Sequence, residues 1–191
     1  MTRRVGILGY QGAIEPHEGM LSRLGVSTLR VRSTEDLAKI DRIILPGGES
    51  GTMVRFLKMY GLFAPLQEFA RDKPTWGICA GSILIARTVS NPSQESLNAI
   101  DIAAHRNFYG SQLDSFSTTL SIAGLNHPVS AQFIRAPRLS PLADTNNRAP
   151  LAVLASHEST PVFFKQGRVW ACAFHIELGD DPSLHELFLG L

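Results

Sequence analysis

The stretch Trp76-Gly77-Ile78-Cys79-Ala80-Gly81-Ser82 joins an apolar segment to a second apolar run, residues 83–86. The segment that ends at Trp76 predicts a buried strand, and residues 83–86 predict the helix that follows it. One thiol lies between two glycines, in the spacing Gly-x-Cys-x-Gly. A sharp strand-to-helix turn needs glycine on both sides, because a Cβ atom would collide with the neighbouring strands. The stretch therefore predicts a tight turn that carries Cys79 at a helix N-terminus.

A thiol in that position has two interpretations. The partial positive charge and free N–H groups of a helix N-terminus favour a thiolate and can hold an oxyanion, which suits a nucleophile. Alternatively, Cys79 is a buried core thiol, a common place for cysteine. The flanking glycines favour the nucleophile, because a core cysteine has no need of them. Cys172 lies in an ordinary apolar segment and is expected to be a packed strand residue.

Working outward, the first half of the chain alternates short apolar runs with amphipathic segments. This rhythm predicts a parallel sheet covered by helices on both faces. The expected strands are residues 5–8, 27–31, 42–45 and the run into Cys79; the expected helices lie around 18–24, from 33–36 onward, at 52–59, at 65–70 and at 83–86.

The second half is richer in strands. Residues 161–164 and 169–174 predict a hairpin around Gln166-Gly167. A last helix is expected at Ser183–Leu189, capped by Asp181-Pro182, with proline at its favoured first position. The other segments expected here are a polar turn at 89–98 and short strands at 112–119, 129–133 and 151–155. We expect one α/β domain, residues 1–191, with a β-rich second half.

Composition narrows the class of protein. Hydrophobic residues make up 44% and charged residues 18% of the 191 residues, which excludes a disordered chain. The net charge of +1 does not indicate binding to nucleic acid or to a membrane surface. Two cysteines are too few for a disulfide framework, and without a Cys-x-x-Cys pair no structural zinc site is expected. No apolar run is long enough to span a membrane or serve as a secretory signal, so a cytoplasmic location is expected.

A candidate base lies near the other end of the chain, in Phe174-His175-Ile176-Glu177. In an extended segment, residues two apart lie on one face, so Glu177 could orient the His175 imidazole as the third member of a triad. A solvated His–Glu pair in a loop is the alternative. His-x-Glu also occurs in zinc deaminases, but the Pro-Cys-x-x-Cys that follows it there is absent. The other five histidines show no metal-ligand spacing and are expected to be structural or exposed: His17, His105, His127, His157 and His185.

A second glycine turn follows a predicted strand, in Pro46-Gly47-Gly48-Glu49. No Gly-Lys-Ser/Thr follows, which argues against a phosphate loop. A backbone N–H at Gly47-Gly48 that faced Cys79 would donate to an oxyanion, although tight-turn geometry alone could explain the glycines. Arg106 and Arg135 lie in apolar surroundings, where each is either paired for structure or placed to bind a carboxylate.

These pieces, in this order, resemble the class I glutamine amidotransferase family, and within it the glutaminase subunits of pyridoxal 5′-phosphate synthases. The elbow around Cys79 and His175-Ile176-Glu177 resemble glutaminases in general. The more specific segments are Val5–Ala13, Ile44–Ser50, Arg106–Gln112 with Asp114–Phe116, Phe133–Pro137 and Phe174–Leu178.

The resemblance implies a flavodoxin-like α/β fold and a glutamine amidohydrolase that needs no cofactor and no metal. Cys79, His175 and Glu177 would be the catalytic triad, and backbone N–H groups near Gly48 and Ala80 would hold the oxyanion. The residues implied to bind L-glutamine are Gly47, Gly48, Glu49, Ala80, Arg106, Ile134 and Arg135. Gln11 matches a family position at the interface with the synthase subunit, the implied partner and recipient of the ammonia.

The chain departs from the family at four positions. It has Gly51, Ile78, Ser111 and Ile176 where the family usually has threonine, threonine, arginine and proline. None of these changes removes a reacting group, but Gly51 could loosen a helix start and Ser111 removes a charge. Two other functions stay open: a catalytically silent docking subunit, and another cysteine hydrolase of similar fold.

Overall fold

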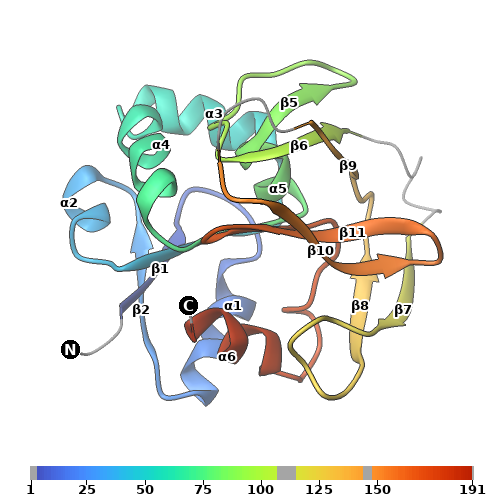
Figure 1. Cartoon of the computed structure of the whole chain (residues 1–191). Coiled ribbons are helices and arrows are strands. Elements are labelled where there is room, and N and C mark those ends of the chain that lie inside the picture. The colour runs from blue at the N-terminus through green and yellow to red at the C-terminus, as the bar shows by residue number, and fades with distance from the viewer. Residues whose placement is uncertain (1–3, 107–114, 144–147, 191) are drawn as a thin grey trace.

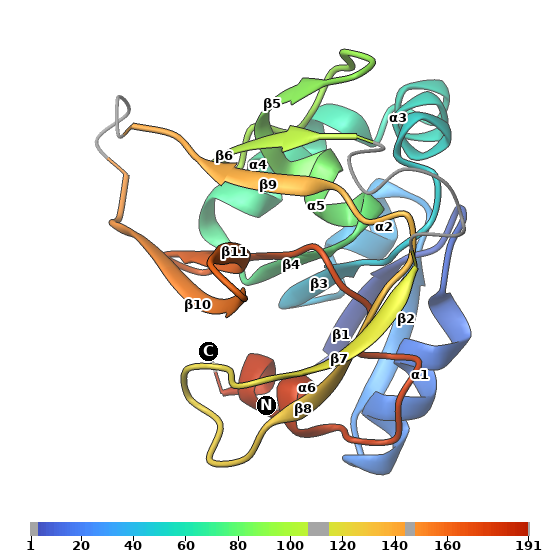
Figure 2. The same cartoon turned by 90° about the vertical axis from the view of Figure 1, so that its right-hand side faces the viewer.

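The computed structural model describes residues 4–106, 115–143 and 148–190, and the statements below concern these ranges. Seven of their strands form the main sheet (Figures 1 and 2), and their spatial order is β10-β11-β12-β4-β3-β1-β2. The strands are β1 (Arg4–Leu8), β2 (Ser27–Val31), β3 (Arg42–Leu45), β4 (Thr75–Ile78), β10 (Leu151–His157), β11 (Thr160–Gln166) and β12 (Val169–Cys172).

The sheet is mostly parallel, as the sequence predicts. The neighbouring strands β2, β1, β3, β4 and β12 run parallel to one another, whereas β11 and β10 add an antiparallel edge. Every residue of β3, β4 and β12 is buried, which explains why these strands are mostly apolar rather than alternating; Arg42 and Thr75, the first residues of β3 and β4, are the buried exceptions. Parallel strands end at a common edge, so the turns that follow β1, β3, β4 and β12 meet there.

Helices cover both faces of the sheet, as expected. α1 and α6 lie on one face, and α3, α4 and α5 lie on the other (Figures 1 and 2). No helix in the described ranges is long and apolar enough to cross a membrane. The helices are α1 (Ile14–Arg23), α2 (Thr34–Leu37), α3 (Ser50–Met59), α4 (Phe63–Asp72), α5 (Ala80–Ile85) and α6 (Ser183–Leu189).

The second half differs from its prediction in detail. The expected helix at 83–86 stops at Ile85, and Ala86 begins a strand that occupies the start of the expected turn at 89–98. The strands Ile100–His105 and Arg138–Pro141 were not predicted, because both mix polar and apolar residues and show no clear period. β5 (Ala86–Ser90), β6 (Ile100–His105) and β9 (Arg138–Pro141) form a small sheet, and β7 (Phe116–Leu120) pairs with β8 (Val129–Phe133).

The hairpin around Gln166-Gly167 forms as expected, between β11 and β12. The start of α6 differs, because Pro182 is the residue before the first helical position. Asp181 contributes to the cap, as expected, because its Oδ1 accepts a hydrogen bond from the Ser183 N–H at 2.9 Å. Residues 112–114 of the expected strand 112–119 lie outside the described residues, and β7 covers the remainder from Phe116.

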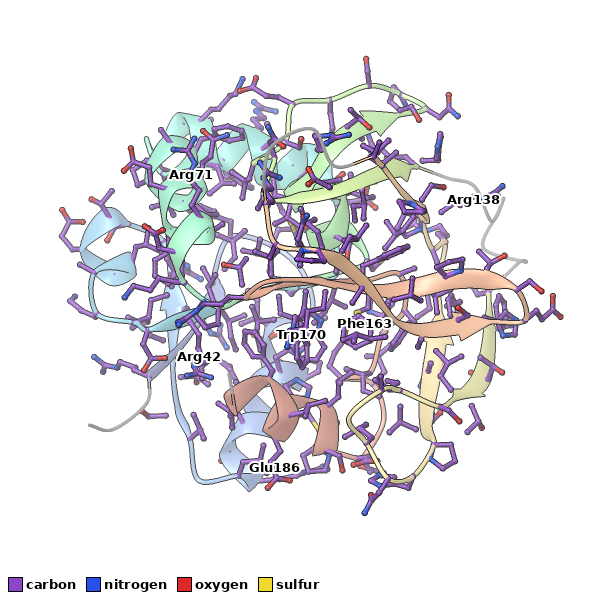
Figure 3. The ribbon with its side chains drawn as sticks, in the orientation of Figure 1. Arg42, Arg71, Arg138, Phe163, Trp170 and Glu186 are labelled. Carbon is purple, nitrogen blue, oxygen red and sulfur yellow. The ribbon has the colours of Figure 1, made fainter. Side chains whose placement is uncertain are left out.

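Aromatic side chains fill the space between the sheet and α6. Trp170 and Phe163 extend from neighbouring strands (Figure 3), and Trp170 lies 5.5 Å from the ring of Phe188 on α6. The nearly buried Arg42 donates from Nη1 to the carbonyl oxygens of Phe188 and Leu189 at 2.9 and 2.7 Å. These bonds satisfy carbonyl groups that a helix end leaves unpaired, so α6 is held firmly against the sheet.

Candidate active site

Cys79 lies at the turn between β4 and α5. Its backbone has φ 50° and ψ −102°, a conformation that residues with a Cβ rarely adopt. Its N–H donates to the carbonyl oxygen of Cys172 at 2.8 Å, and its carbonyl oxygen accepts from the N–H groups of Ser82 and Ile83. The turn is therefore anchored to β12 on one side and to the first turn of α5 on the other.

The flanking glycines are required by close approaches of the backbone. A Cβ on Gly81 would lie 1.9 Å from the carbonyl oxygen of Leu45, at the end of β3. A Cβ on Gly77 would lie 2.6 Å from the carbonyl group of Gly81. Both contacts are far shorter than atoms tolerate, so only glycine lets α5 start this close to the sheet.

Ser82 braces the same turn from inside the protein. Its hydroxyl oxygen lies 2.7 Å from the carbonyl oxygens of both Gly77 and Cys172, and the residue is fully buried. One hydroxyl hydrogen can serve only one of them at a time. Ser82 thus joins β4, α5 and β12 beneath Cys79.

His175 follows β12 and is positioned by its backbone. Its N–H donates to the carbonyl oxygen of Gln132 at 2.8 Å, and the Gln132 N–H donates back at 3.0 Å, an isolated bridge to β8. The imidazole lies against Gly47, where a Cβ would be 2.2 Å from His175 Cε1. The glycine after β3 therefore makes room for the ring.

The imidazole contacts a carboxylate on one side. His175 Nδ1 lies 2.6 Å from Glu177 Oε1, and both side chains are buried. A carboxylate can only accept, so Nδ1 carries the proton and Nε2 remains to act on a thiol. Burial lowers the pKa of His175, but hydrogen bonds to Cys79 and Glu177 outweigh burial and raise it to about 10.

The carboxylate itself is held in its charged form. Burial raises the pKa of Glu177, but the hydrogen bond from His175 and the proximity of His17 more than offset burial, so the net pKa is below its ordinary value. An ionised Glu177 stabilises a positive charge on His175, and His175 in turn favours removal of the proton from Cys79. These three side chains can therefore perform nucleophilic chemistry.

The Gly47-Gly48 turn lines the same cavity as Cys79 and His175. Gly48 has φ 157°, and a Cβ there would meet the side-chain oxygen of Gln11 at 2.6 Å. That oxygen accepts a hydrogen bond from the Glu49 N–H at 2.8 Å, and the Gly47 carbonyl oxygen accepts from Ala13 at 3.0 Å. Gln11, expected at a partner interface, thus also holds the turn in place.

Two charged side chains meet at the entrance to this cavity. Arg135 Nη2 donates to Glu49 Oε1 at 3.1 Å, and each side chain is more than half exposed. Arg135 has φ 45°, and the carbonyl oxygen of the preceding Ile134 lies 4.0 Å from Cys79 Sγ. Glu49 and Arg135 were both expected to bind glutamine, and their pairing with each other was not expected.

The structure brings the predicted site residues together around one cavity of about 330 Å³. Glu177 lies behind His175 rather than on the wall. Ile176, at the departure from proline, is buried in the core, and Gly51 lies inside α3, which forms nonetheless. Ser111 lies outside the described residues. The predicted residues on the wall are Gln11, Gly47, Gly48, Glu49, Cys79, Ala80, Arg106, Ile134, Arg135 and His175.

Two buried histidines near Glu177 were not assigned to the site from the sequence. His17 on α1 and His185 on α6 are fully buried, and His17 Nε2 lies 3.8 Å from Glu177 Oε2. A signal was present, because His17 occupies the apolar face of α1, three residues after Ile14 and three before Met20. Among the described residues, no group of His, Cys, Asp and Glu side chains is arranged to hold a metal ion.

Comparison with known proteins agrees with this geometry. The sequence model of the SNO glutamine amidotransferase family matches residues 7–190. A relative from Deinococcus radiodurans, named pyridoxal 5′-phosphate synthase subunit PdxT, is 45% identical over 98% of this chain and 96% of its own length. A relative of the same name from Fervidobacterium nodosum is 42% identical over 97% of this chain and 95% of its own length.

Solved structures give the same result. A glutamine amidotransferase crystal structure superimposes with a TM-score of 0.89 at 35% identity and covers 97% of both chains. A glutamine amidotransferase from Thermotoga maritima superimposes with a TM-score of 0.59 at 16% identity and supports the fold alone; the match covers 94% of this chain and 78% of that one. The flavodoxin-like fold expected from the sequence is thus confirmed.

Proposed function

The chain belongs to the SNO glutamine amidotransferase family, and from that premise we propose that it is the glutaminase subunit of a pyridoxal 5′-phosphate synthase. It hydrolyses the side-chain carboxamide of L-glutamine and supplies the ammonia for vitamin B6 synthesis. The observation that carries this function is the 2.6 Å contact between His175 and Glu177, beside a thiol that a strained turn holds at the cavity wall.

The reaction begins at Cys79. The Cys79 proton passes to His175 Nε2, whose raised pKa favours the pair of imidazolium and thiolate, and the thiolate sulfur then attacks the carboxamide carbon of glutamine. Negative charge then develops on the carboxamide oxygen, where backbone N–H groups near Gly48 and Ala80 stabilise it. Loss of one such donor typically slows a reaction by about a hundredfold or more.

The intermediate collapses to a thioester. His175 gives its proton to the departing nitrogen, and ammonia leaves. His175 then removes a proton from water, which attacks the thioester carbon and releases glutamate. The proton returns to the Cys79 sulfur, so enzyme and proton balance are restored, and Glu177 stabilises the imidazolium throughout.

Substrate recognition is assigned to the charges around the mouth. Glu49 suits the ammonium group of glutamine, and Arg106 and Arg135 suit its carboxylate. The 3.1 Å pair between Glu49 and Arg135 keeps two of these groups ready at the entrance. Because both are more than half exposed, the pair is weak and can open when glutamine binds.

The partner proposed here is the synthase subunit. Ammonia released into neutral water becomes ammonium and loses its nucleophilicity, so direct transfer to a partner is needed. Relatives 42 and 45% identical to this chain are named as synthase subunits, which supports this assignment, and Gln11 is the residue we place near that interface. We also propose a single domain, residues 1–191, and a cytoplasmic location, where Cys79 and Cys172 stay reduced.

The decisive experiment measures ammonia released from L-glutamine with and without the synthase subunit. Wild-type protein with the synthase should release ammonia, and Cys79→Ala should release none while keeping its fold and its complex. Ammonia release by Cys79→Ala would contradict the proposal. If wild-type protein bound the synthase but released no ammonia, it would be a silent docking subunit. Labelling of Cys79 by peptide probes but not by a glutamine analogue would instead indicate another cysteine hydrolase.

A further inference from the structure

Two buried histidines, His17 and His185, lie beyond the three reacting side chains. With His175 and Glu177 they form a row of polar groups in the order His175, Glu177, His17, His185. His17 Nδ1 lies 2.8 Å from His185 Nε2, and His17 Nε2 faces Glu177 Oε2 at 3.8 Å. The side chains of His17 and Glu177 are completely buried. The two histidines come from α1 and α6, which lie side by side on one face of the sheet (Figure 1).

Both facing atoms lack a hydrogen bond within the described residues. Glu177 Oε2 and His17 Nε2 are buried and unpartnered, and they point at each other. A buried carboxylate oxygen without a donor is strongly unfavourable. A shift of roughly 0.8 Å would bring the pair to hydrogen-bond distance.

We propose that His17 is a positioning residue, which donates from Nε2 to Glu177 and holds that carboxylate in the orientation that His175 requires. This inference rests on the proposed function and adds to it a role for His17 and for His185, which fixes the tautomer of His17.

The direction of each hydrogen bond follows from the carboxylate. Glu177 can only accept, so a neutral His17 that carries its proton on Nδ1 would aim a lone pair at a buried negative charge. The favourable tautomer carries the proton on Nε2 and leaves Nδ1 to accept from His185 Nε2. The row then has one consistent order of donors, with Glu177 as acceptor from His17 on one side and from His175 on the other.

His17 acts in this row as a neutral donor. Burial lowers its pKa to about 4, despite the opposing effect of Glu177. The groups that face Glu177 are His175 and His17, with Cys79 and Cys172 nearby and His185 behind His17. Because His17 stays neutral above about pH 5, it stabilises the Glu177 charge without cancelling the attraction between Glu177 and His175.

Two substitutions separate donation from packing. In His17→Gln the amide nitrogen reaches the place of Nε2 and can still donate to Glu177. In His17→Asn the shorter amide reaches only the place of Nδ1, so it can contact His185 but not Glu177. Ammonia release should be measured for both variants in complex with the synthase, alongside their thermal unfolding.

We expect His17→Asn to lower kcat about tenfold with little change in KM, because glutamine does not contact this residue. His17→Gln should restore most of the loss. Alkylation of Cys79 by iodoacetamide should require a higher pH in His17→Asn than in His17→Gln, since a less stabilised Glu177 holds the His175 charge less well. Equal kcat values for the two variants, whether high or low, would overturn the inference.

A direct measurement applies even if a variant does not fold. The ¹⁵N spectrum of histidine-labelled wild-type protein distinguishes the two neutral tautomers, and we expect the His17 proton on Nε2. A proton on Nδ1 would overturn the inference. This result is independent of the proposed function, which fails instead if wild-type complex releases no ammonia from glutamine.

Discussion

Cys79 combines a reactive side chain with a backbone conformation that costs free energy. A non-glycine residue at φ 50° and ψ −102° is strained by about 1–3 kcal/mol, and such strain persists only where surrounding structure imposes it. Here the bond from the Cys79 N–H to Cys172 and the close approach of Gly81 to Leu45 impose it. The same turn that strains the residue also turns its sulfur into the cavity.

Replacement of Cys79 should reveal this strain. We expect Cys79→Gly to be more stable to urea than Cys79→Ala by about 1 kcal/mol, because glycine adopts positive φ without cost. At Cys172, where the backbone is an ordinary strand, the order should reverse, with Cys172→Ala the more stable by about 0.5–1 kcal/mol. If alanine were the more stable substitution at position 79, the strain would not exist.

Glu49 should affect substrate binding more than chemistry. We expect Glu49→Gln to raise KM for glutamine about tenfold with a small change in kcat, because one charge-assisted hydrogen bond to the substrate ammonium is lost. Steady-state ammonia release with the synthase present measures both constants. Glu68→Gln on the exposed side of α4, away from the cavity, is the matched control. An unchanged KM in Glu49→Gln would exclude Glu49 as a ligand.

At the level of elements, the site depends on how closely α5 approaches β3. The approach is possible only because Gly81 has no side chain, since its Cβ would lie 1.9 Å from the Leu45 carbonyl oxygen. That oxygen belongs to the backbone of a buried strand and cannot move aside. The helix, and Cys79 with it, would have to shift to admit even a methyl group.

We therefore expect opposite effects from two glycine-to-alanine substitutions. Gly81→Ala should destabilise the protein by about 3 kcal/mol or more and abolish ammonia release, because it forces α5 away from β3. Gly19→Ala lies in α1 with no atom within 4 Å of the added Cβ, and should stabilise by about 0.5–1 kcal/mol. Thermal unfolding of both variants measures the difference. A Gly81→Ala protein as stable as wild type would refute this packing.

For the whole molecule, buried imidazoles determine how stability varies with pH. Burial lowers the pKa of His17 to about 4 and that of His185 to about 3. Below about pH 6.5 these two histidines therefore bind protons in the unfolded chain but stay neutral in the folded protein until the pH is much lower. Their contribution to stability is thus present above about pH 6.5 and is lost as the pH falls. His175 behaves in the opposite way, because its pKa in the folded state rises to about 10. Its contribution is present below about pH 6.5 and is lost as the pH rises toward 10.

We expect the free energy of unfolding to be greatest near pH 6.5 and to decline on both sides, by about 1.4 kcal/mol per pH unit for each group. Urea unfolding between pH 4 and pH 10 measures the curve. His185→Gln should flatten the acid side only, and Cys79→Ala should flatten the alkaline side only, because Cys79 helps to raise the pKa of His175. A curve that both variants leave unchanged would contradict these assignments.

The class of fold and the candidate nucleophile could be predicted from the sequence. Both depend on local pattern: continuous apolar strands require burial on both faces, and Gly77 and Gly81 around Cys79 require a close turn. The strands β6 and β9 could not be predicted, because they mix polar and apolar residues and no period marks them. For the same reason Ala86 was expected in a helix although it begins β5.

Which side chains contact one another could not be predicted and depends on how the chain packs. Cys79 and His175 are 96 positions apart, and they share a cavity because parallel strands end at one edge of the sheet. The contact between His17 and Glu177 and the pair between Glu49 and Arg135 likewise join distant segments. Residue type and spacing show what chemistry a side chain can perform, but packing determines its neighbours. Until those neighbours are known, a buried histidine such as His17 cannot be distinguished from an ordinary core residue.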